Sequence, residues 1–119
     1  MVDSWFNGYN VPSDKRITSL WRGTISTVLI DLLDSTHLNV TSIGGVIIRL
    51  FTASSTISVQ VGDSDGNVPS ATLTTANGIV VTDTVPFIYS PSLGNDQRLT
   101  VLKAIAGGAI ANVEVIGLE

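Results

Sequence analysis

The chain of 119 residues contains no cysteine, which excludes several classes of protein. Disulfide-stapled scaffolds, zinc fingers, iron–sulfur centres and thiol enzymes all depend on that side chain. No apolar run approaches the ~18 residues of a membrane-spanning helix, and the N-terminus lacks the basic-then-apolar layout of a secretory signal. The length predicts one domain that is large enough to fold around its own core.

Charged residues are also scarce, at 13% of the chain, whereas about a quarter is usual. The formal net charge of −4 argues against nucleic acids and anionic membranes as partners, because both bind basic faces. Strongly charged surfaces keep monomers apart, so a weakly charged surface favours association with other subunits. Polar uncharged surfaces are also common in β-sandwiches, and both interpretations stay open.

Valine, isoleucine, threonine and serine dominate what is present, and these are strand and turn residues. No window of a dozen residues shows a helical stripe, and turn clusters recur at the short spacing of a sandwich or barrel. We predict an all-β, antiparallel two-layer β-sandwich that is jelly-roll-like and carries an irregular N-terminal arm. The arm spans 1–23 and the sandwich domain 24–119. Pattern alone does not separate jelly-roll from immunoglobulin-like topologies, although a Cys…Trp…Cys framework is missing.

Alternation of apolar and polar residues marks the strands that we expect. It is clearest over 56–62, where Ile57, Val59 and Val61 alternate with polar or small residues. Paired glycines at Gly107-Gly108 predict a tight hairpin between the last two strands. The segment 70–75 is ambiguous between a strand and a helical turn. The other expected strands are 24–33, 44–53, 79–85, 87–89, 97–105 and 110–118.

The arm concentrates aromatic and basic residues without a regular period. Aromatic side chains are costly to leave in water, so the arm is expected to lie on a surface. Its charge is opposite in sign to that of the acidic body, which suits contact with another copy. Folding back as the first strand of its own sheet is equally consistent with the pattern. The predicted interaction residues are Trp5, Phe6, Tyr9, Lys15, Arg16, Trp21 and Arg22.

Nothing in the sequence assembles a recognisable active site. His37 is the only histidine, no serine has a nucleophile-elbow setting, and we expect an exposed loop residue. The run Asp63–Asn67 looks like a calcium loop, but its glycine and twelfth residue do not fit the EF-hand spacing, so a turn is the simpler interpretation. We predict no catalytic residue, no metal and no cofactor.

Residues 43–66, IGGVIIRLFTASSTISVQVGDSDG, resemble small β-sandwich virion proteins of tailed bacteriophages. The shared features are a Gly-Gly-initiated strand, a small-residue turn, an alternating strand that ends in Gly-Asp, and an acidic loop. The likeness covers roughly 40–118 and lies in the residue types and order of the segments more than in a single motif.

This resemblance implies a structural role in the virion, assembled in the host cytoplasm. The first form of that role is a capsid cement or decoration protein that bridges capsomers. Its implied partners are the major capsid protein or another virion protein and further copies of itself, with a homotrimer favoured. The alternative is a tail, neck or fibre component whose β-sandwich binds a glycan or receptor, with Trp5, Tyr9 and Trp21 as the rings for stacking. Neither form has a family catalytic residue.

Overall fold

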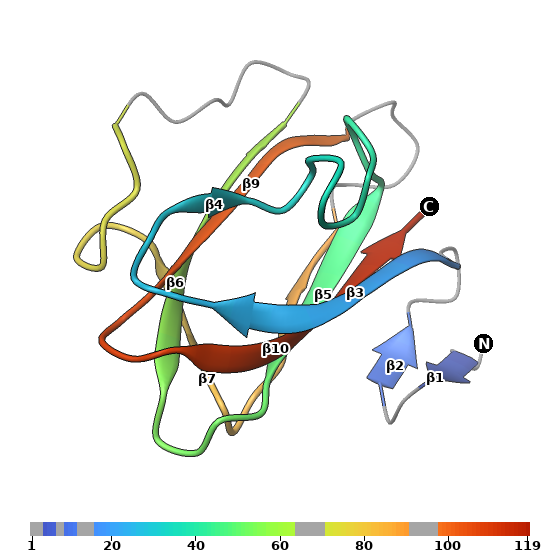
Figure 1. Cartoon of the computed structure of the whole chain (residues 1–119). Coiled ribbons are helices and arrows are strands. Elements are labelled where there is room, and N and C mark those ends of the chain that lie inside the picture. The colour runs from blue at the N-terminus through green and yellow to red at the C-terminus, as the bar shows by residue number, and fades with distance from the viewer. Residues whose placement is uncertain (1–3, 7–8, 12–15, 64–70, 91–97) are drawn as a thin grey trace.

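The computed structural model describes residues 4–6, 9–11, 16–63, 71–90 and 98–119, the first two segments by their backbone alone. All regular structure in these segments is β-strand (Figure 1). The strands, in chain order, are β1 Ser4–Phe6, β2 Tyr9–Val11, β3 Ile17–Ile25, β4 Ile30–Asp31, β5 Gly45–Leu50, β6 Thr56–Asp63, β7 Ile79–Thr82, β8 Phe87–Tyr89, β9 Leu99–Ala106 and β10 Ala111–Leu118.

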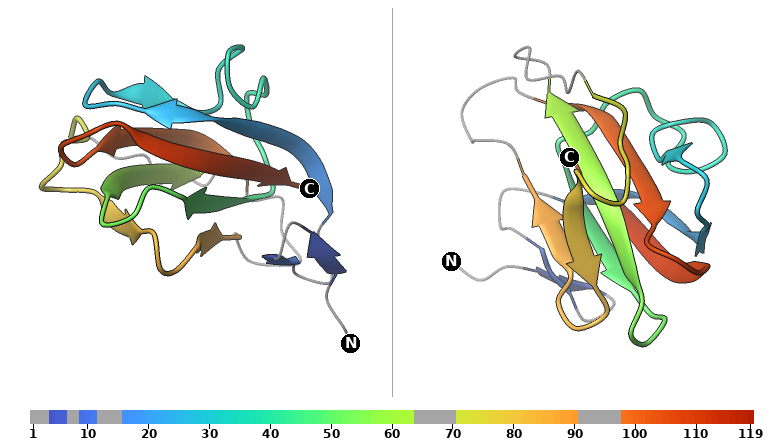
Figure 2. Two further views of the ribbon diagram at one scale, coloured as in Figure 1. Left: turned by 60° about the horizontal axis from the view of Figure 1, so that its bottom comes forward. Right: turned by 90° about the vertical axis from the view of Figure 1, so that its left-hand side faces the viewer.

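Eight of these strands form two four-stranded antiparallel sheets that pack face to face (Figure 2). One sheet has the order β3-β10-β5-β8 and the other β4-β9-β6-β7, while β1 and β2 form a separate hairpin. The chain passes between the sheets at six connections, β3–β4, β4–β5, β5–β6, β7–β8, β8–β9 and β9–β10, and stays in one sheet only from β6 to β7. This connectivity is that of a jelly roll, so the predicted fold class is confirmed.

The core lies between the two sheets and is made of aliphatic side chains. In β5, Val46, Ile48 and Leu50 point into it, while Arg49 between them is exposed, as the alternation predicts. Ile57 and Val59 of β6 are fully buried from the opposite sheet. Burial of such side chains contributes about 1.5–3 kcal/mol each, so this core is the main source of stability.

A second, smaller cluster lies on the outer face of the β3-β10-β5-β8 sheet. Ile47 and Ile116 are fully buried and face each other across β5 and β10, and Leu118 belongs to the same cluster. The neighbouring strands add Leu20 opposite Ile116 and Ile88 opposite Ile47, both about half exposed. An apolar row therefore crosses all four strands of this sheet on its outer side.

The first strand of the sandwich differs from the expected segment 24–33. Strand β3 ends at Ile25, and residues 26–29 form the loop that carries the chain to the other sheet. Val28, expected on the same face as Ile30 and Leu32, is 68% exposed, whereas Leu32 is fully buried. The apolar alternation continues through a turn, and a local pattern does not record which sheet a residue belongs to.

Residues 17–23, which the sequence pattern left within an irregular arm, form most of strand β3. They pair with β10 from Leu20 opposite Ile116 to Gly23 opposite Val113. The interpretation of the arm as a first strand of its own sheet therefore holds for this part. Nearer the N-terminus, β1 and β2 pair with each other, with Ser4 opposite Val11 and Phe6 opposite Tyr9.

The expected tight hairpin at Gly107-Gly108 is wrong. Strand β9 pairs with β4 and β6, and β10 pairs with β3 and β5, so the loop between them joins two sheets. A Cβ at Gly107 would lie 2.5 Å from Thr56 Oγ1, so close approach of the start of β6 explains the glycine there.

Candidate functional site

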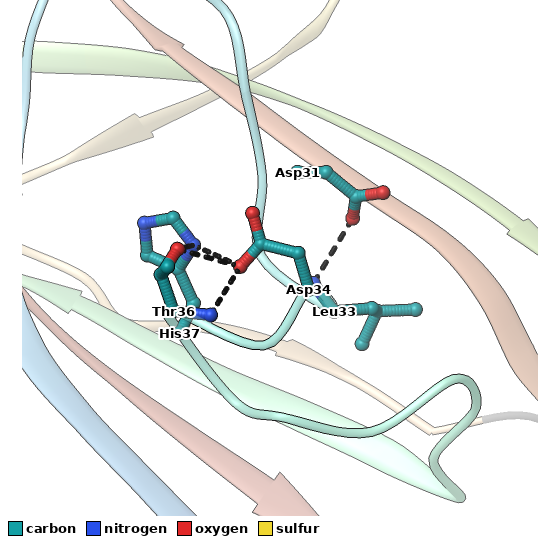
Figure 3. A network of polar contacts seen from close by, with 5 residues as sticks. All are labelled: Asp31, Leu33, Asp34, Thr36 and His37. Carbon is teal, nitrogen blue, oxygen red and sulfur yellow. Dashed lines mark hydrogen bonds and ion pairs between the residues drawn. The ribbon is translucent and has the colours of Figure 1, made fainter.

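The only histidine lies in a polar cluster in the loop between β4 and β5 (Figure 3). Asp34 Oδ1 lies 2.5 Å from His37 Nδ1 and accepts hydrogen bonds from the Thr36 backbone N–H at 3.0 Å and the Thr36 hydroxyl at 2.9 Å. The Asp34 carbonyl also accepts from the backbone N–H of Asn39 at 2.8 Å. Asp34 thus caps a tight local turn.

Burial is the largest single effect on Asp34 and raises its pKa, but the hydrogen bonds from His37 and Thr36 together outweigh it and lower the pKa below its ordinary value. The carboxylate is therefore held in its charged form. Because it lies beside Nδ1 of His37, it fixes that nitrogen as the one that carries the proton.

The side chain of His37 is only 14% exposed, so the expectation of an exposed loop residue is wrong for the ring. Its edge packs against Trp21, with ring centroids 4.5 Å apart and planes at 77°. Such an edge-to-face contact fixes both rings. The loop between β4 and β5 is thereby anchored to the inner side of β3.

The cluster lacks the arrangement of a hydrolytic triad. A triad places the nucleophilic hydroxyl on the ring nitrogen that the carboxylate does not contact. Within the described residues, the hydroxyl in contact with His37 belongs to Thr36 and lies 3.1 Å from Nδ1, on the carboxylate side. The geometry therefore orders the loop and gives no route for proton transfer to a nucleophile.

No group of three or more histidine or carboxylate side chains in the described segments is placed to hold a metal ion. Asp63, the first residue of the calcium-like run, ends β6 and is buried. Residues 64–67 of that run lie outside the described residues, so the interpretation as a turn stays a prediction.

Of the seven predicted interaction residues, three fall where the structure describes side chains. Arg16 is exposed, and its backbone pairs with Glu119 in both directions, at 3.0 and 2.9 Å. Arg22 is 61% exposed and forms an ion pair with Glu114. Trp21 is half-buried and packs against the core. The side chains of Trp5, Phe6, Tyr9 and Lys15 lie outside the described residues.

Trp21 is turned away from the surface that a sugar would need. Its ring lies over Gly23, where an added Cβ would come within 3.0 Å of Cε2 and Cη2. Strand β3 therefore needs glycine at this position to make room for the tryptophan. The ring also packs on the core and on His37, so only part of its surface is exposed.

Arg22 belongs to a row of charges on the outer face of the β3-β10-β5-β8 sheet. Glu114 of β10 lies opposite Arg22 on one side and Arg49 on the other. Only 1% of Glu114 is exposed, which requires a cationic neighbour for the buried carboxylate. The row of charges therefore stabilises the sheet. It could not be predicted from the sequence, because it depends on the register of the strands.

One end of the sandwich, which sequence reasoning did not single out, gathers four of the loops that connect the two sheets, namely β3–β4, β5–β6, β7–β8 and β9–β10 (Figure 1). We call residues 26–29, 51–55, 83–86 and 107–110 the loop tip. Each of its loops exposes one large apolar side chain, at 49% to 68% of its full surface. These residues are Val28, Phe51, Val85 and Ile110.

The loop tip is almost free of charge, since Asp83 is its single charged residue. Three of its loops are built of serine, threonine, glycine and apolar residues alone. Exposed apolar side chains with so few charges between them are typical of protein contact surfaces.

Backbone contacts hold the loop tip in place. The N–H of Phe51 donates to the Asn112 carbonyl at 2.8 Å, and the N–H of Gly107 donates to the Thr56 carbonyl at 2.9 Å. The guanidinium of Arg49 lies 5.2 Å from the centre of the Phe51 ring. A surface fixed in this way loses little conformational entropy when it binds.

Two of the loops enclose a shallow hollow of about 300 Å³. Its lining is uncharged and mostly hydroxyl-bearing or glycine, and it consists of Ser54, Ser55, Thr56, Gly107, Gly108 and Ala109. Ser54 has a φ of 61°, a left-handed conformation that turns the β5–β6 loop over the hollow. A single protruding side chain of a partner would fit this hollow.

No family model, no curated protein and no solved structure matches the chain. The described segments contain no helix long and apolar enough to cross a membrane. The case for a function therefore depends on the fold and on the surfaces described above.

Proposed function

We propose that this chain is a structural protein that binds other protein subunits through its loop tip. In its most specific form, the proposal is a virion protein of a tailed bacteriophage that decorates and stabilises a capsid. The observation that carries it is the loop tip itself, where four loops expose Val28, Phe51, Val85 and Ile110 with one charged residue among them. The jelly-roll fold supports the proposal further, since it is common among viral capsid domains.

The physical role would be stabilisation by binding. A protein that binds the assembled shell but not its separated parts shifts the equilibrium towards the shell. Repetition over a symmetric particle multiplies a modest interface into high total avidity. A weakly charged, preformed apolar surface is suited to this role, because little ordering and little charge desolvation oppose binding.

The test uses purified particles from a culture that produces this protein. Mass spectrometry of gradient-purified particles should detect its peptides, and purified protein should rebind particles from which it has been stripped. The double variant Phe51→Ser/Ile110→Ser removes two exposed anchors and should rebind at least about tenfold more weakly.

Val80→Ser is the matched control, because Val80 is also apolar and 60% exposed but lies on β7, outside the loop tip. It should rebind like the parent protein. Absence of the chain from purified particles would refute the virion role. Normal rebinding by the double variant would instead show that the loop tip is not the contact.

A further inference from the structure

The two sheets have four edge strands, and one of them differs from the rest in length. Strands β4, β8 and β7 are two, three and four residues long, whereas β3 has nine. Short edge strands are a common protection against pairing with another chain, because they offer few free backbone groups. Only the β3 edge lacks this protection.

Strand β3 has a bulge at Thr18, near its start, but from Ser19 onward it lacks the other usual protections. It contains no proline and no lysine, and its one charged residue, Arg22, is bound to Glu114 of the neighbouring strand. Its partner is β10 alone, and the described residues form no backbone hydrogen bond with its outer edge. In Figure 1 this edge faces the viewer, with no labelled strand in front of it.

We propose that β3 is a self-association surface, on which β3 of a second copy pairs antiparallel across a two-fold axis at Trp21. Strand β3 is regular from Ser19 to Ile25, and this axis pairs residues 19–23 of one copy with the same residues of the other in reverse order. Leu20 then faces Arg22, and Trp21 faces its own equivalent. The β3-β10-β5-β8 sheets of the two copies then form one continuous sheet of eight strands.

The charges and side chains of β3 fit a second copy in this register. Arg22 faces Leu20 of the other copy instead of its own equivalent, so no like charges stand directly opposite each other. Leu20 is 45% exposed and ends the apolar row of the outer face, where it would be covered by the aliphatic stem of Arg22. The same contact occurs twice, as a two-fold interface requires.

This pairing goes beyond the proposed docking of the loop tip and uses different residues. It also differs from the trimer implied by the resemblance to phage virion proteins, because a two-fold pair of edge strands closes on itself. The mass of the assembly in solution therefore discriminates between the two.

The first experiment compares Leu20→Lys with Leu20→Glu by sedimentation equilibrium over a range of concentrations. The parent chain should show a monomer–dimer equilibrium. Lysine at position 20 would face Arg22 of the second copy twice in the dimer and should raise the dissociation constant by about tenfold, whereas glutamate should lower it. Position 20 is half exposed, so both variants should fold, which circular dichroism checks.

A second experiment tests the register by cross-linking, which the cysteine-free chain makes simple. In Leu20→Cys the thiols of the two copies lie on the same face, diagonally across the axis at about 7–8 Å. A short bismaleimide should therefore yield a covalent dimer. Thr100→Cys, exposed on β9, should not.

A chain that stays monomeric at all concentrations would overturn the proposal, and so would a trimer. Equal effects of lysine and glutamate at position 20 would refute the register, as would a covalent dimer no more abundant than in the Thr100→Cys control. Phe51→Ser/Ile110→Ser leaves β3 unchanged and should dimerise normally, so failure of the loop-tip proposal is distinguishable from failure of this one.

Discussion

Gly23 is the position where the structure allows a sharp prediction about the packing of β3. Replacing it with alanine adds a Cβ that clashes with Cζ2 of Trp21 and lies 3.0 Å from Cε2 and Cη2, so the ring or the strand must shift. The ring has little freedom to move, because it packs on the core and on His37. Gly23→Ala should therefore destabilise the sandwich.

The magnitude follows from two opposing terms. Forcing an extra methyl group into a packed site costs about 1–3 kcal/mol. Alanine restricts the unfolded chain more than glycine does, and this returns about 0.4–1 kcal/mol. The net loss should be about 1–2 kcal/mol. With a urea m value of about 2 kcal/mol per molar, the unfolding midpoint falls by about 0.5–1 M.

Urea unfolding followed by tryptophan fluorescence and by circular dichroism measures this loss. Gly108→Ala is the matched control, because nothing lies within 4 Å of a Cβ built there, and it should be neutral or slightly stabilising. Trp21→Phe removes the ring atoms that clash, so Gly23→Ala should cost less in the Trp21→Phe background than in the parent. A Gly23→Ala variant as stable as the parent, or additive effects of the two substitutions, would refute the reasoning.

Two further predictions concern stability. The folded-state pKa of Asp34 is below its unfolded value, so its stabilising contribution is complete above about pH 4 and is lost as the pH falls through the lower folded-state pKa. Melting temperatures measured from about pH 6 downward should therefore converge for the parent and Asp34→Asn at the acid end; a constant difference would contradict this. On β7, Val81→Ala should cost about 2 kcal/mol because Val81 is buried, and Val80→Ala less than about 0.5 because Val80 is exposed, as denaturant unfolding would show.

The strands that sequence reasoning located best are those whose two faces meet different environments. Strand β5 is such a case, since Val46, Ile48 and Leu50 face the core around the exposed Arg49. Strand β6 is another, because Ile57 and Val59 are buried at the alternation that the pattern showed. In both, the period of two records a real difference between core and surroundings.

The sequence left 17–23 open between an irregular arm and a first strand, because the inner face of β3 alternates small residues with a tryptophan and shows no apolar period. Ser19, Trp21 and Gly23 follow one another on that face, and the small residues leave room for the tryptophan ring. The loop 26–29 was mistaken for strand because its apolar residues keep the alternation of the segments around it. Which sheet receives each segment depends on pairing with strands far along the chain, which a local pattern does not contain.

The surfaces were predictable only in part. The low charge of the chain indicated association, but the loop tip joins four segments that are distant in sequence. The position of Val28 beside Phe51, Val85 and Ile110 at one end follows from the jelly-roll connectivity alone. Likewise, Glu114 meets Arg22 and Arg49 because the register of β10 sets it between them.

The central place of β10 in its sheet has a consequence for how the chain folds as it is synthesised. Strand β3 emerges early, but its neighbour in the sheet is the last of the ten strands. Until β10 inserts between β3 and β5, β3 has no partner strand and β5 pairs with β8 alone. Closure of so long a loop is slow, so we expect the pairing of β3 with β10 to be a late step in folding.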